Sequence, residues 1–355
     1  MKKLLLLTAM LWSSTALADD IIDTHLLNEM FTTVNNEYLE SVDNTELAAA
    51  GLTAIHDLDS KIVISKGSDR FYIYYNSQIN KIVPFPKDTA SVTGWVDTSV
   101  QVIEAAAKLS EKIALQDFQI PDLMMKKMAA KLDPYSHYYS EYNYEDTEEE
   151  NAIYTLYSDR KIDDILYLRV RIFNKQTDTM VKQSLENNPD VKGVILDLRG
   201  NSGGMLNAAL KVADLFCDDE IITYTAGRNN ENIHYYTSKE GAMYEGPLVV
   251  LVDGETASAA EVLAGGLQEQ SRAKLIGTRT FGKGTIQNIT QMSNGGKLVL
   301  TTEQFFTPSG KIIHHNGITP DVCLMPDVDG TCPRISRLNE DADIEQAVKL
   351  FSHIK

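Results

Sequence analysis

The second half of the chain alternates between short apolar runs and amphipathic stretches, and this alternation restricts the fold more than any other feature. Apolar runs predict strands at 165–173, 194–198, 248–252, 273–278, 285–291 and 298–305. Helices are predicted at 180–185, from the glycines near 204 to about 216, and from about 258 to 270. Strands separated by helices favour a parallel or mixed sheet that helices cover. The predicted fold class is therefore α/β, with its core at 164–322.

Residues 19–140 follow a different pattern, which is mainly helical. Apolar residues fall at helical spacing in 22–58 and again in 97–132, where Asp133-Pro134 ends the helix because a residue before proline avoids the helical conformation. Between these stretches, 61–85 has strand character. We expect a mainly helical N-terminal region with a short strand pair. We also expect a C-terminal extension, 323–355, that ends in a helix.

The segment between the two parts, 141–163, is predicted to be an acidic linker. Its first ten positions contain six acidic residues: Glu141, Glu145, Asp146, Glu148, Glu149 and Glu150. Such a run is usually solvated, and a bound cation is the alternative interpretation.

The charge balance narrows the classes of partner. The chain has 33 Lys and Arg against 50 Asp and Glu, a formal net charge of −17. A field of this sign repels phosphate backbones and anionic membrane surfaces. We therefore predict that nucleic acid is not a partner.

Residues 1–18 are predicted to be an export signal. Lys2 and Lys3 precede an apolar stretch at 4–12, and 16–18 (Ala-Leu-Ala) has the small-x-small pattern of a cleavage site. The apolar stretch is shorter than the roughly 20 residues that span a membrane, so stable insertion is not expected. We predict cleavage near Ala18 and a periplasmic or secreted protein.

Two of the three cysteines bracket a short loop. In an oxidising compartment, Cys323 and Cys332 could form a disulfide, and Cys217 would then remain as a buried thiol. No metal spacing such as H-E-x-x-H occurs, and the Gly-rich segment lacks the G-x-G-x-x-G spacing of a dinucleotide site. Neither a metal nor another cofactor is predicted.

Three loops, each next to a predicted strand, carry the candidate chemistry. The loop 199–204 (R-G-N-S-G-G) lies between a strand and a helix, where backbone N–H groups suit an anion or oxyanion. The loop 253–261 places Ser258 at a helix start, but Ser258 and Glu261 also match a capping box that needs no chemistry. The loop 281–287 holds Lys283 between two glycines, with Gln287 four residues further on.

A serine nucleophile requires a general base. A lysine serves only in its neutral form, which burial favours, and Gln287 could orient Lys283 without restoring its charge. The alternative base is His314 or His315, completed by Asp321. Adjacent histidines in an extended chain point to opposite faces, so at most one of them could fill this role.

Together these loops resemble those of the carboxyl-terminal-processing, or tail-specific, serine proteases. The matching segments are 132–136, 193–204, 256–261, 277–287, 307–310 and 317–322. The resemblance implies a crotonase-like α/β core with a helical N-terminal region. It also implies a Ser/Lys dyad in which Ser258 is the nucleophile, Lys283 the general base and Gln287 the residue that orients Lys283. The oxyanion hole would combine the backbone N–H of Ala259 with that of Gly203 or Gly204.

Family members commonly carry a PDZ domain after the 132–136 segment, and here 139–163 is too short for one. The resemblance thus implies a PDZ-less exported serine endopeptidase that cleaves protein or peptide substrates through an acyl-enzyme, with room for an activating partner or homo-oligomer. A non-catalytic ligand- or peptide-binding protein on the same scaffold is the alternative, as in the interphotoreceptor retinoid-binding protein.

Overall fold

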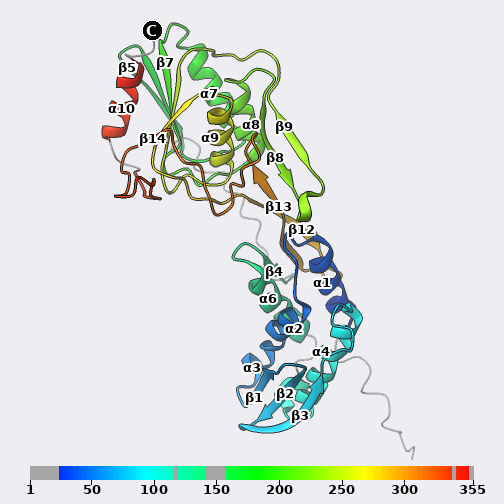
Figure 1. Ribbon diagram of the computed structural model, residues 1–355. Helices are drawn as coiled ribbons and strands as arrows, with labels where there is room; N and C mark the ends of the chain where they lie inside the picture. The colour runs from blue at the N-terminus through cyan, green and yellow to red at the C-terminus, as the bar shows by residue number, and fades with distance from the viewer. Residues whose placement is uncertain (1–23, 116–118, 141–156, 338–340, 352–355) are drawn as a thin grey trace, which may run out of the picture. The chain divides into compact units, whose positions relative to one another are not determined.

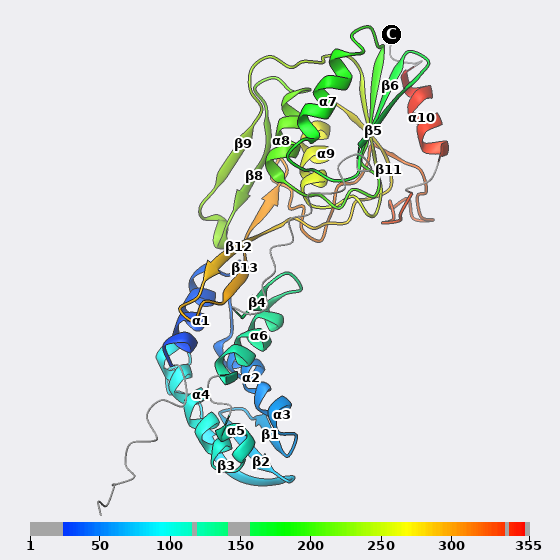
Figure 2. The same cartoon turned by 180° about the vertical axis from the view of Figure 1, so that it is seen from behind.

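A computed structural model of the protein describes residues 24–115, 119–140, 157–337 and 341–351 (Figures 1 and 2). The predicted export signal at 1–18 and the acidic run at 141–150 lie outside the described residues. The chain divides into two units. One comprises Met1–Tyr144 with Ile289–Leu300, and the other comprises Glu145–Asn288 with Thr301–Lys355.

A six-stranded sheet forms the centre of the second unit. Its strand order is β14–β11–β10–β7–β6–β5, and every neighbouring pair is parallel except the β5–β6 hairpin. The strands are β5 (Tyr157–Ile162), β6 (Ile165–Val170), β7 (Gly193–Asp197), β10 (Leu248–Val252), β11 (Lys274–Gly277) and β14 (Val322–Cys323). Every residue of β7 and β10 is buried, as expected for parallel strands covered on both faces. The predicted α/β class is confirmed.

Helices cover both faces of this sheet (Figure 1). One face packs against α7 (Thr177–Glu186), α8 (Leu206–Asp214) and α9 (Ala259–Glu269), and the other against α10 (Asp341–Phe351). Because successive side chains of a strand point to opposite faces of the sheet, each strand contributes to the apolar core on both faces. Val250 faces α8 and α9, whereas Val249 packs with Ile344 of α10. The C-terminal extension therefore provides one layer of the core.

A second, antiparallel sheet contributes β8 (Ile221–Ala226) and β9 (His234–Thr237), which pair with each other. Within the second unit, β8 also pairs with residues 304–306 of β13 (Lys297–Phe306), and β12 (Thr285–Gln291) adjoins β13. Neither β8 nor β9 was predicted from the sequence. Three of the four residues of β9 are exposed, so this strand carries no apolar alternation.

The first unit has a core of its own, built mainly from helices. Its elements are α1 (Thr24–Glu37), α2 (Asn44–Leu52), α3 (Ala54–Leu58), β1 (Ile62–Lys66), β2 (Arg70–Tyr75), β3 (Gln78–Pro84), α4 (Val92–Ala107), α5 (Glu111–Ala114), α6 (Ile120–Leu132) and β4 (His137–Tyr139). The predicted strand pair is wrong, because β1–β2–β3 form a three-stranded antiparallel sheet. The additional turn is at Asn76-Ser77, where both residues have positive φ, as primed hairpin turns require.

Two predicted boundaries also need correction. Residues 289–300 fall inside the predicted core at 164–322, yet Met292 and Leu298 are buried in the core of the first unit, where 297–299 pair with β4. The predicted linker 141–163 ends in a strand, since β5 occupies 157–162. That edge strand is mostly exposed and polar, and therefore resembles a linker in sequence.

A buried ion network joins α10 to the end of β7. The guanidinium of Arg199 donates to both oxygens of Asp197, at 2.9 and 2.7 Å, and to Asp343 Oδ2 at 3.2 Å. Arg337 donates to both oxygens of Asp343 at 2.6–3.0 Å. The side chains of Asp197 and Asp343 are fully buried. Two positive and two negative charges thus compensate each other away from water.

The cysteines follow the arrangement considered above. A disulfide joins Cys323, at the end of β14, to Cys332. Cys217 is a buried free thiol, and burial raises the pKa of this thiol to about 11.

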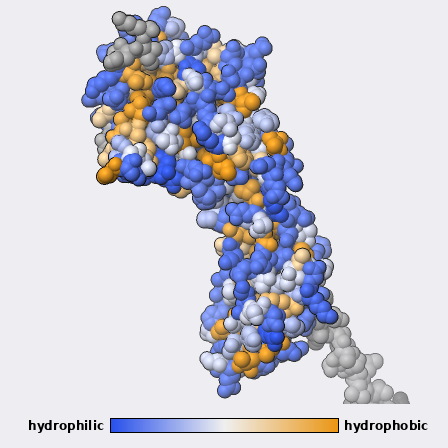
Figure 3. Space-filling model, viewed as in Figure 1, coloured by the Kyte–Doolittle hydropathy of each residue, from blue (hydrophilic) through white to orange (hydrophobic). Residues whose placement is uncertain are grey.

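Hydrophilic residues predominate on the face of the molecule seen in Figure 3, with apolar residues in small groups. Among the described helices, none combines the length and apolar character that crossing a membrane requires.

Removing one charge from the buried network should strongly destabilise the protein. We expect Asp343→Asn to lower the free energy of unfolding by about 3–5 kcal/mol, because two buried guanidinium groups lose their common partner. Urea unfolding followed by circular dichroism measures the change. The control is Lys192→Met, which removes an exposed ion pair with Asp164 and should leave the midpoint nearly unchanged. Equal midpoints for the two variants would contradict the network's role.

Thiol titration should separate the three cysteines. We expect no reaction of Ellman's reagent with the native protein, because the Cys217 thiol is buried and protonated. In denaturant we expect one thiol per chain without reductant and three after reduction. Three thiols before reduction would show that the disulfide is absent.

Candidate active site

Ser258 occupies the sharp connection between β10 and α9 and has an unusual backbone conformation. Its φ and ψ are 55° and −123°, whereas a residue that only caps a helix normally has extended backbone angles. Positive φ in a non-glycine residue is strained by roughly 1–3 kcal/mol and persists only when its surroundings enforce it. The side chain is partly exposed. Helix capping alone does not account for this conformation.

The carboxylate of Glu261 holds the backbone of Ser258 in this conformation. Oε2 accepts the N–H of Ser258 at 2.9 Å, which is the carboxylate half of the capping box formed by these two residues. The same carboxylate accepts the Thr280 hydroxyl at 2.5 Å and the N–H groups of Gly282 and Lys283 at 2.6 and 2.9 Å. One fully buried side chain thus connects the loop of Ser258 to the loop of Lys283.

Burial also changes the pKa of the Glu261 carboxyl. Burial raises the pKa of this carboxyl above its usual range, and the hydrogen bonds from Thr280 and the three backbone N–H groups oppose that rise. Burial of the Glu261 carboxylate therefore costs free energy. All four hydrogen bonds that it accepts come from the Ser258 loop and the 280–283 loop.

Asp253 holds the start of the Ser258 loop through a second set of hydrogen bonds. Its Oδ1 accepts the N–H groups of Gly200, Glu255 and Thr256 at 3.0–3.1 Å, and its Oδ2 accepts the N–H of Arg337 at 2.9 Å. The N–H of Ala257 donates to the carbonyl of Asn201 at 2.8 Å. The Ser258 loop and the Gly-rich loop are thus joined by direct hydrogen bonds.

The Gly-rich loop lies directly against Ser258. Gly203 and Gly204 have φ values of 108° and 109°, and a Cβ on Gly203 would lie 2.7 Å from Ser258 Cβ and 3.2 Å from the nitrogen of Ala259. A Cβ on Gly204 would lie 2.3 Å from the carbonyl oxygen of Phe173. Only glycine fits either position. The structure therefore brings Gly203, Ser258 and Ala259 together.

The two glycines differ in the availability of their N–H groups. The N–H of Gly203 donates to Asn201 Oδ1 at 2.8 Å. Within the described residues, no acceptor is bonded to the N–H of Gly204 or of Ala259. Ala259 directly follows Ser258 and Gly204 directly follows Gly203, which lies against Ser258, and both N–H groups remain available to an anionic ligand.

Lys283 follows a tight turn at Gly282 and is partly buried. Gln287 lies on β12, where its Nε2 donates to the hydroxyls of Thr285 and Thr301 at 3.0 and 3.1 Å. This network orients the amide so that Oε1 remains as an acceptor. Oε1 could therefore accept a hydrogen bond from an amine.

The histidine alternative gains no support from the position of Asp321. Its Oδ2 accepts the N–H of Leu275 at 2.8 Å and the Gln268 amide at 3.2 Å, and its Oδ1 lies 3.4 Å from Lys274 Nζ. The rings of His314 and His315 contact each other instead, with centroids 3.8 Å apart and planes tilted by 40°. Asp321 therefore does not orient a histidine base.

Sequence reasoning missed part of the site. It treated Glu261 only as a capping partner and gave no role to Asp253 or Thr280. The S-x-x-E spacing was the available signal for Glu261, but its bonds to 280–283 join segments about 20 residues apart, which spacing alone does not reveal. Among the described residues, no group of His, Cys, Asp and Glu is arranged to hold a metal ion.

Comparison with known proteins points to one family. Residues 164–324 match the model of peptidase family S41. The carboxy-terminal-processing protease of Bartonella bacilliformis is 40% identical over 168 residues, which cover 45% of this chain and 39% of that protein. The carboxyl-terminal-processing protease of Synechocystis is 40% identical over 157 residues, covering 44% and 36%. The match spans about two fifths of the length of these relatives.

A solved structure of a lipoprotein from Streptococcus agalactiae has a similar fold over most of the chain. It covers 90% of this chain and 99% of its own, with a TM-score of 0.51 and 16% sequence identity. At this identity the likeness concerns the fold alone.

Truncation of Glu261 should destabilise the protein although no apolar core is lost. We expect Glu261→Ala to lower the free energy of unfolding by more than about 3 kcal/mol, because four donors lose their acceptor and each buried unsatisfied group costs about 1–3 kcal/mol. Urea unfolding measures the effect. The control Glu255→Ala, an exposed residue of the same loop, should change it by less than about 0.5 kcal/mol. Equal stability of the two variants would show that Glu261 does not hold the loops.

Proposed function

We propose that the protein is an exported serine endopeptidase, because residues 164–324 match the model of peptidase family S41 and are similar to carboxyl-terminal-processing proteases. The observation that carries the proposal is the convergence of loops on Ser258. Gly203 and the nitrogen of Ala259 lie against it, and Glu261 connects its loop to that of Lys283. A hydroxyl at a helix start, with available N–H donors beside it, suits acyl transfer.

In the proposed mechanism, Ser258 Oγ attacks the carbonyl carbon of a peptide bond while its proton passes to Lys283 Nζ. The N–H groups of Gly204 and Ala259 bind the developing oxyanion, because that of Gly203 is engaged by Asn201. The tetrahedral intermediate collapses, the C–N bond breaks and the leaving amine takes the proton from Lys283. Lys283 then takes a proton from a water molecule that attacks the ester carbonyl. The C–O bond to Ser258 breaks, Ser258 Oγ regains its proton from Lys283, and the carboxylate product leaves. Gln287 Oε1 orients the amine of Lys283.

Export and the absence of a PDZ domain belong to the same proposal. Export is supported by the sequence of 1–18, and a disulfide between Cys323 and Cys332 suits an oxidising compartment. Because β5 begins at Tyr157, only 140–156 separates it from β4, which is too short for a PDZ fold. Substrate selection would then depend on the protease core itself, on an activating partner or on a homo-oligomer.

A non-catalytic binding protein on the same scaffold is the second candidate. The strained backbone of Ser258 argues against it, because a binding pocket does not require a hydroxyl held at positive φ. A serine-directed acylating probe separates the two. We expect covalent labelling at Ser258 for an enzyme and none for a binding protein.

Cleavage should depend on both members of the dyad. Using residues 19–355 and casein as an unstructured substrate, we expect Ser258→Ala and Lys283→Ala each to lower kcat/KM by at least about 10³-fold, because they remove the nucleophile or the base. Fragment release measured by gel and mass spectrometry provides the rates. The control His314→Gln should retain cleavage. Loss of cleavage in this control with retention in Lys283→Ala would identify a histidine base instead.

A further inference from the structure

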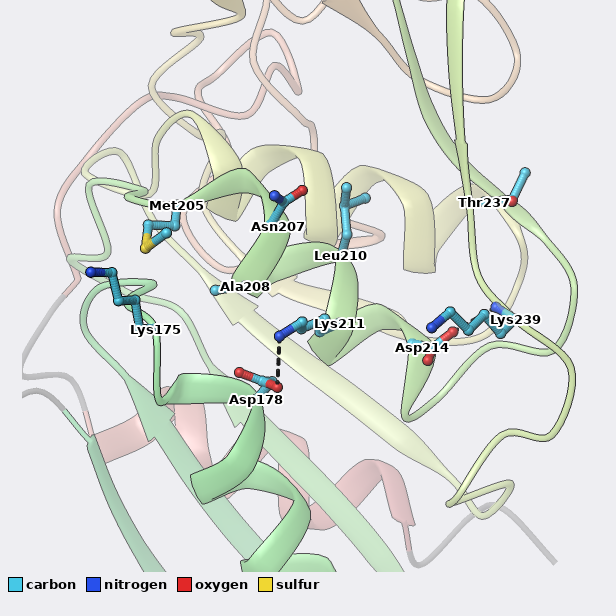
Figure 4. A pocket seen from close by; sticks show the side chains of 10 residues that line it. All are labelled: Lys175, Asp178, Met205, Asn207, Ala208, Leu210, Lys211, Asp214, Thr237 and Lys239. Atoms are coloured by element: carbon cyan, nitrogen blue, oxygen red, sulfur yellow. Dashed lines mark hydrogen bonds and ion pairs between the residues drawn. The ribbon is translucent and has the colours of Figure 1, made fainter.

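A groove of about 440 Å³ in the second unit is lined by an unusual number of basic residues for so acidic a chain (Figure 4). We call it the lysine groove and define it by Lys175, Asp178, Met205, Lys211, Asp214 and Lys239. Figure 4 shows Lys175 and Met205 at one end, Lys239 and Asp214 at the other, and Lys211 pointing toward Asp178 between them. Nothing in the proposed mechanism uses these residues.

One end of the groove adjoins the proposed oxyanion hole. Met205 directly follows Gly204, and its N–H donates to the carbonyl of Phe173 at 2.8 Å. The N–H of Phe173 in turn donates to the carbonyl of Gly203 at 2.8 Å, and Lys175 is two residues further along the chain. The Met205 side chain is 44% exposed and offers an apolar contact at this end. A peptide that reaches Ser258 past Gly204 therefore meets the groove.

The charges of the groove are not fully compensated. Lys211 Nζ lies 3.5 Å from Asp178 Oδ2, and Asp214 Oδ1 accepts the backbone N–H of Lys239 at 2.5 Å. Within the described part of the chain, the ammonium groups of Lys175 and Lys239 have no acidic partner. Three lysines and two aspartates leave the groove positive in a chain whose net charge is −17. A local field of this sign attracts carboxylates.

The length of the groove sets how many substrate residues it could contact. It follows α8, whose residues run from Leu206 to Asp214. At about 1.5 Å of rise per residue, this helix is roughly 14 Å long, which is the span of about four residues of an extended peptide. Carboxylates within about four residues of the cleaved bond would come within reach of the lysines.

We propose that the lysine groove binds carboxylates of the substrate, so that the protein selects peptides with acidic residues close to the cleaved bond. The proposal rests on the endopeptidase function proposed above. A substrate carboxylate has two sources, an Asp or Glu side chain or the C-terminus of the peptide. Both have the chemistry that ammonium groups recognise, and the peptides in the test separate them.

Binding is measured without turnover in Ser258→Ala, by fluorescence anisotropy of labelled peptides. One peptide has Glu at the four positions on either side of a fixed central residue, and its matched partner has Gln at the same positions. Each is made with a free C-terminus and with a C-terminal amide. We expect the Glu peptide to bind at least tenfold more tightly than the Gln peptide, with the difference shrinking as salt is raised from 0.05 to 0.5 M.

Charge reversal tests the groove itself. In the Ser258→Ala background, Lys175→Glu with Lys239→Glu should weaken binding of the Glu peptide by about 10-fold or more, because two exposed attractions become repulsions, while binding of the Gln peptide changes less than about 2-fold. The control pair is Lys61→Glu with Lys87→Glu, two exposed lysines of the first unit that produce the same change in net charge. We expect this pair to bind both peptides like the parent.

The outcomes separate the two proposals. Equal binding of the Glu and Gln peptides with no effect of C-terminal amidation, no binding of the Glu peptide, or equal effects of the two charge-reversal pairs would each overturn the groove. If the protein with Ser258 intact nevertheless cleaves these peptides, the endopeptidase stands without it. Lysine-dependent binding without any cleavage would instead support the groove and overturn the proteolytic function. A preference for the free C-terminus over the amide, with Glu and Gln equal, would assign the carboxylate to the chain end.

Discussion

The candidate site depends on one buried carboxylate. Glu261 accepts the N–H of Ser258 at the start of α9 and, through the same two oxygens, the three donors of the 280–283 loop. Because burial raises its pKa, this side chain is retained at an energetic cost that packing alone would not favour. Its effect is geometric: two segments about 20 residues apart are fixed to a single rigid group. A strained backbone at Ser258 can persist only where its surroundings determine it in this way.

The C-terminal segment also helps to hold the Ser258 loop, and it connects that loop to α10 on the other face of the sheet. The carbonyl of Ile335 accepts the N–H of Gly254 and the hydroxyl of Thr278, so this segment contacts the loops on both sides of α9. Arg337 donates its N–H to Asp253, and its guanidinium binds Asp343 of α10. Since Asp343 also binds Arg199, the Gly-rich loop, the Ser258 loop and the last helix share one buried polar network. Residues of the segment 323–355, which was expected only as a C-terminal extension, therefore help to hold the loops of the candidate site.

Local patterns allowed much of this to be predicted, and long-range contacts account for what was missed. Wholly apolar runs identified β7 and β10 because parallel strands covered on both faces have no polar positions. The polar edge strands β5 and β9 lack that signal. The transfer of 289–300 to the first unit depends on partners such as β4, more than 150 residues away in sequence. The roles of Ser258, Lys283 and Gln287 were predicted from the family resemblance and stay predictions, whereas the proposal of Gly204 rather than Gly203 for the oxyanion hole rests on the bond from Gly203 to Asn201, which the sequence does not reveal.

Binding of acidic peptides in the lysine groove is compatible with the negative net charge of the chain, because salt screens long-range repulsion more than attraction at contact distance. At physiological ionic strength the Debye length is about 8 Å, so the net charge of −17 repels an approaching acidic peptide only weakly from a distance. At contact distance the nearest charged groups decide, and along the groove these include Lys175 at the end next to Met205 and Lys239 at the other end. The proposed PDZ-less endopeptidase would choose its substrates at short range. A positive groove that begins at the residue after Gly204 would make that choice next to the bond to be cleaved.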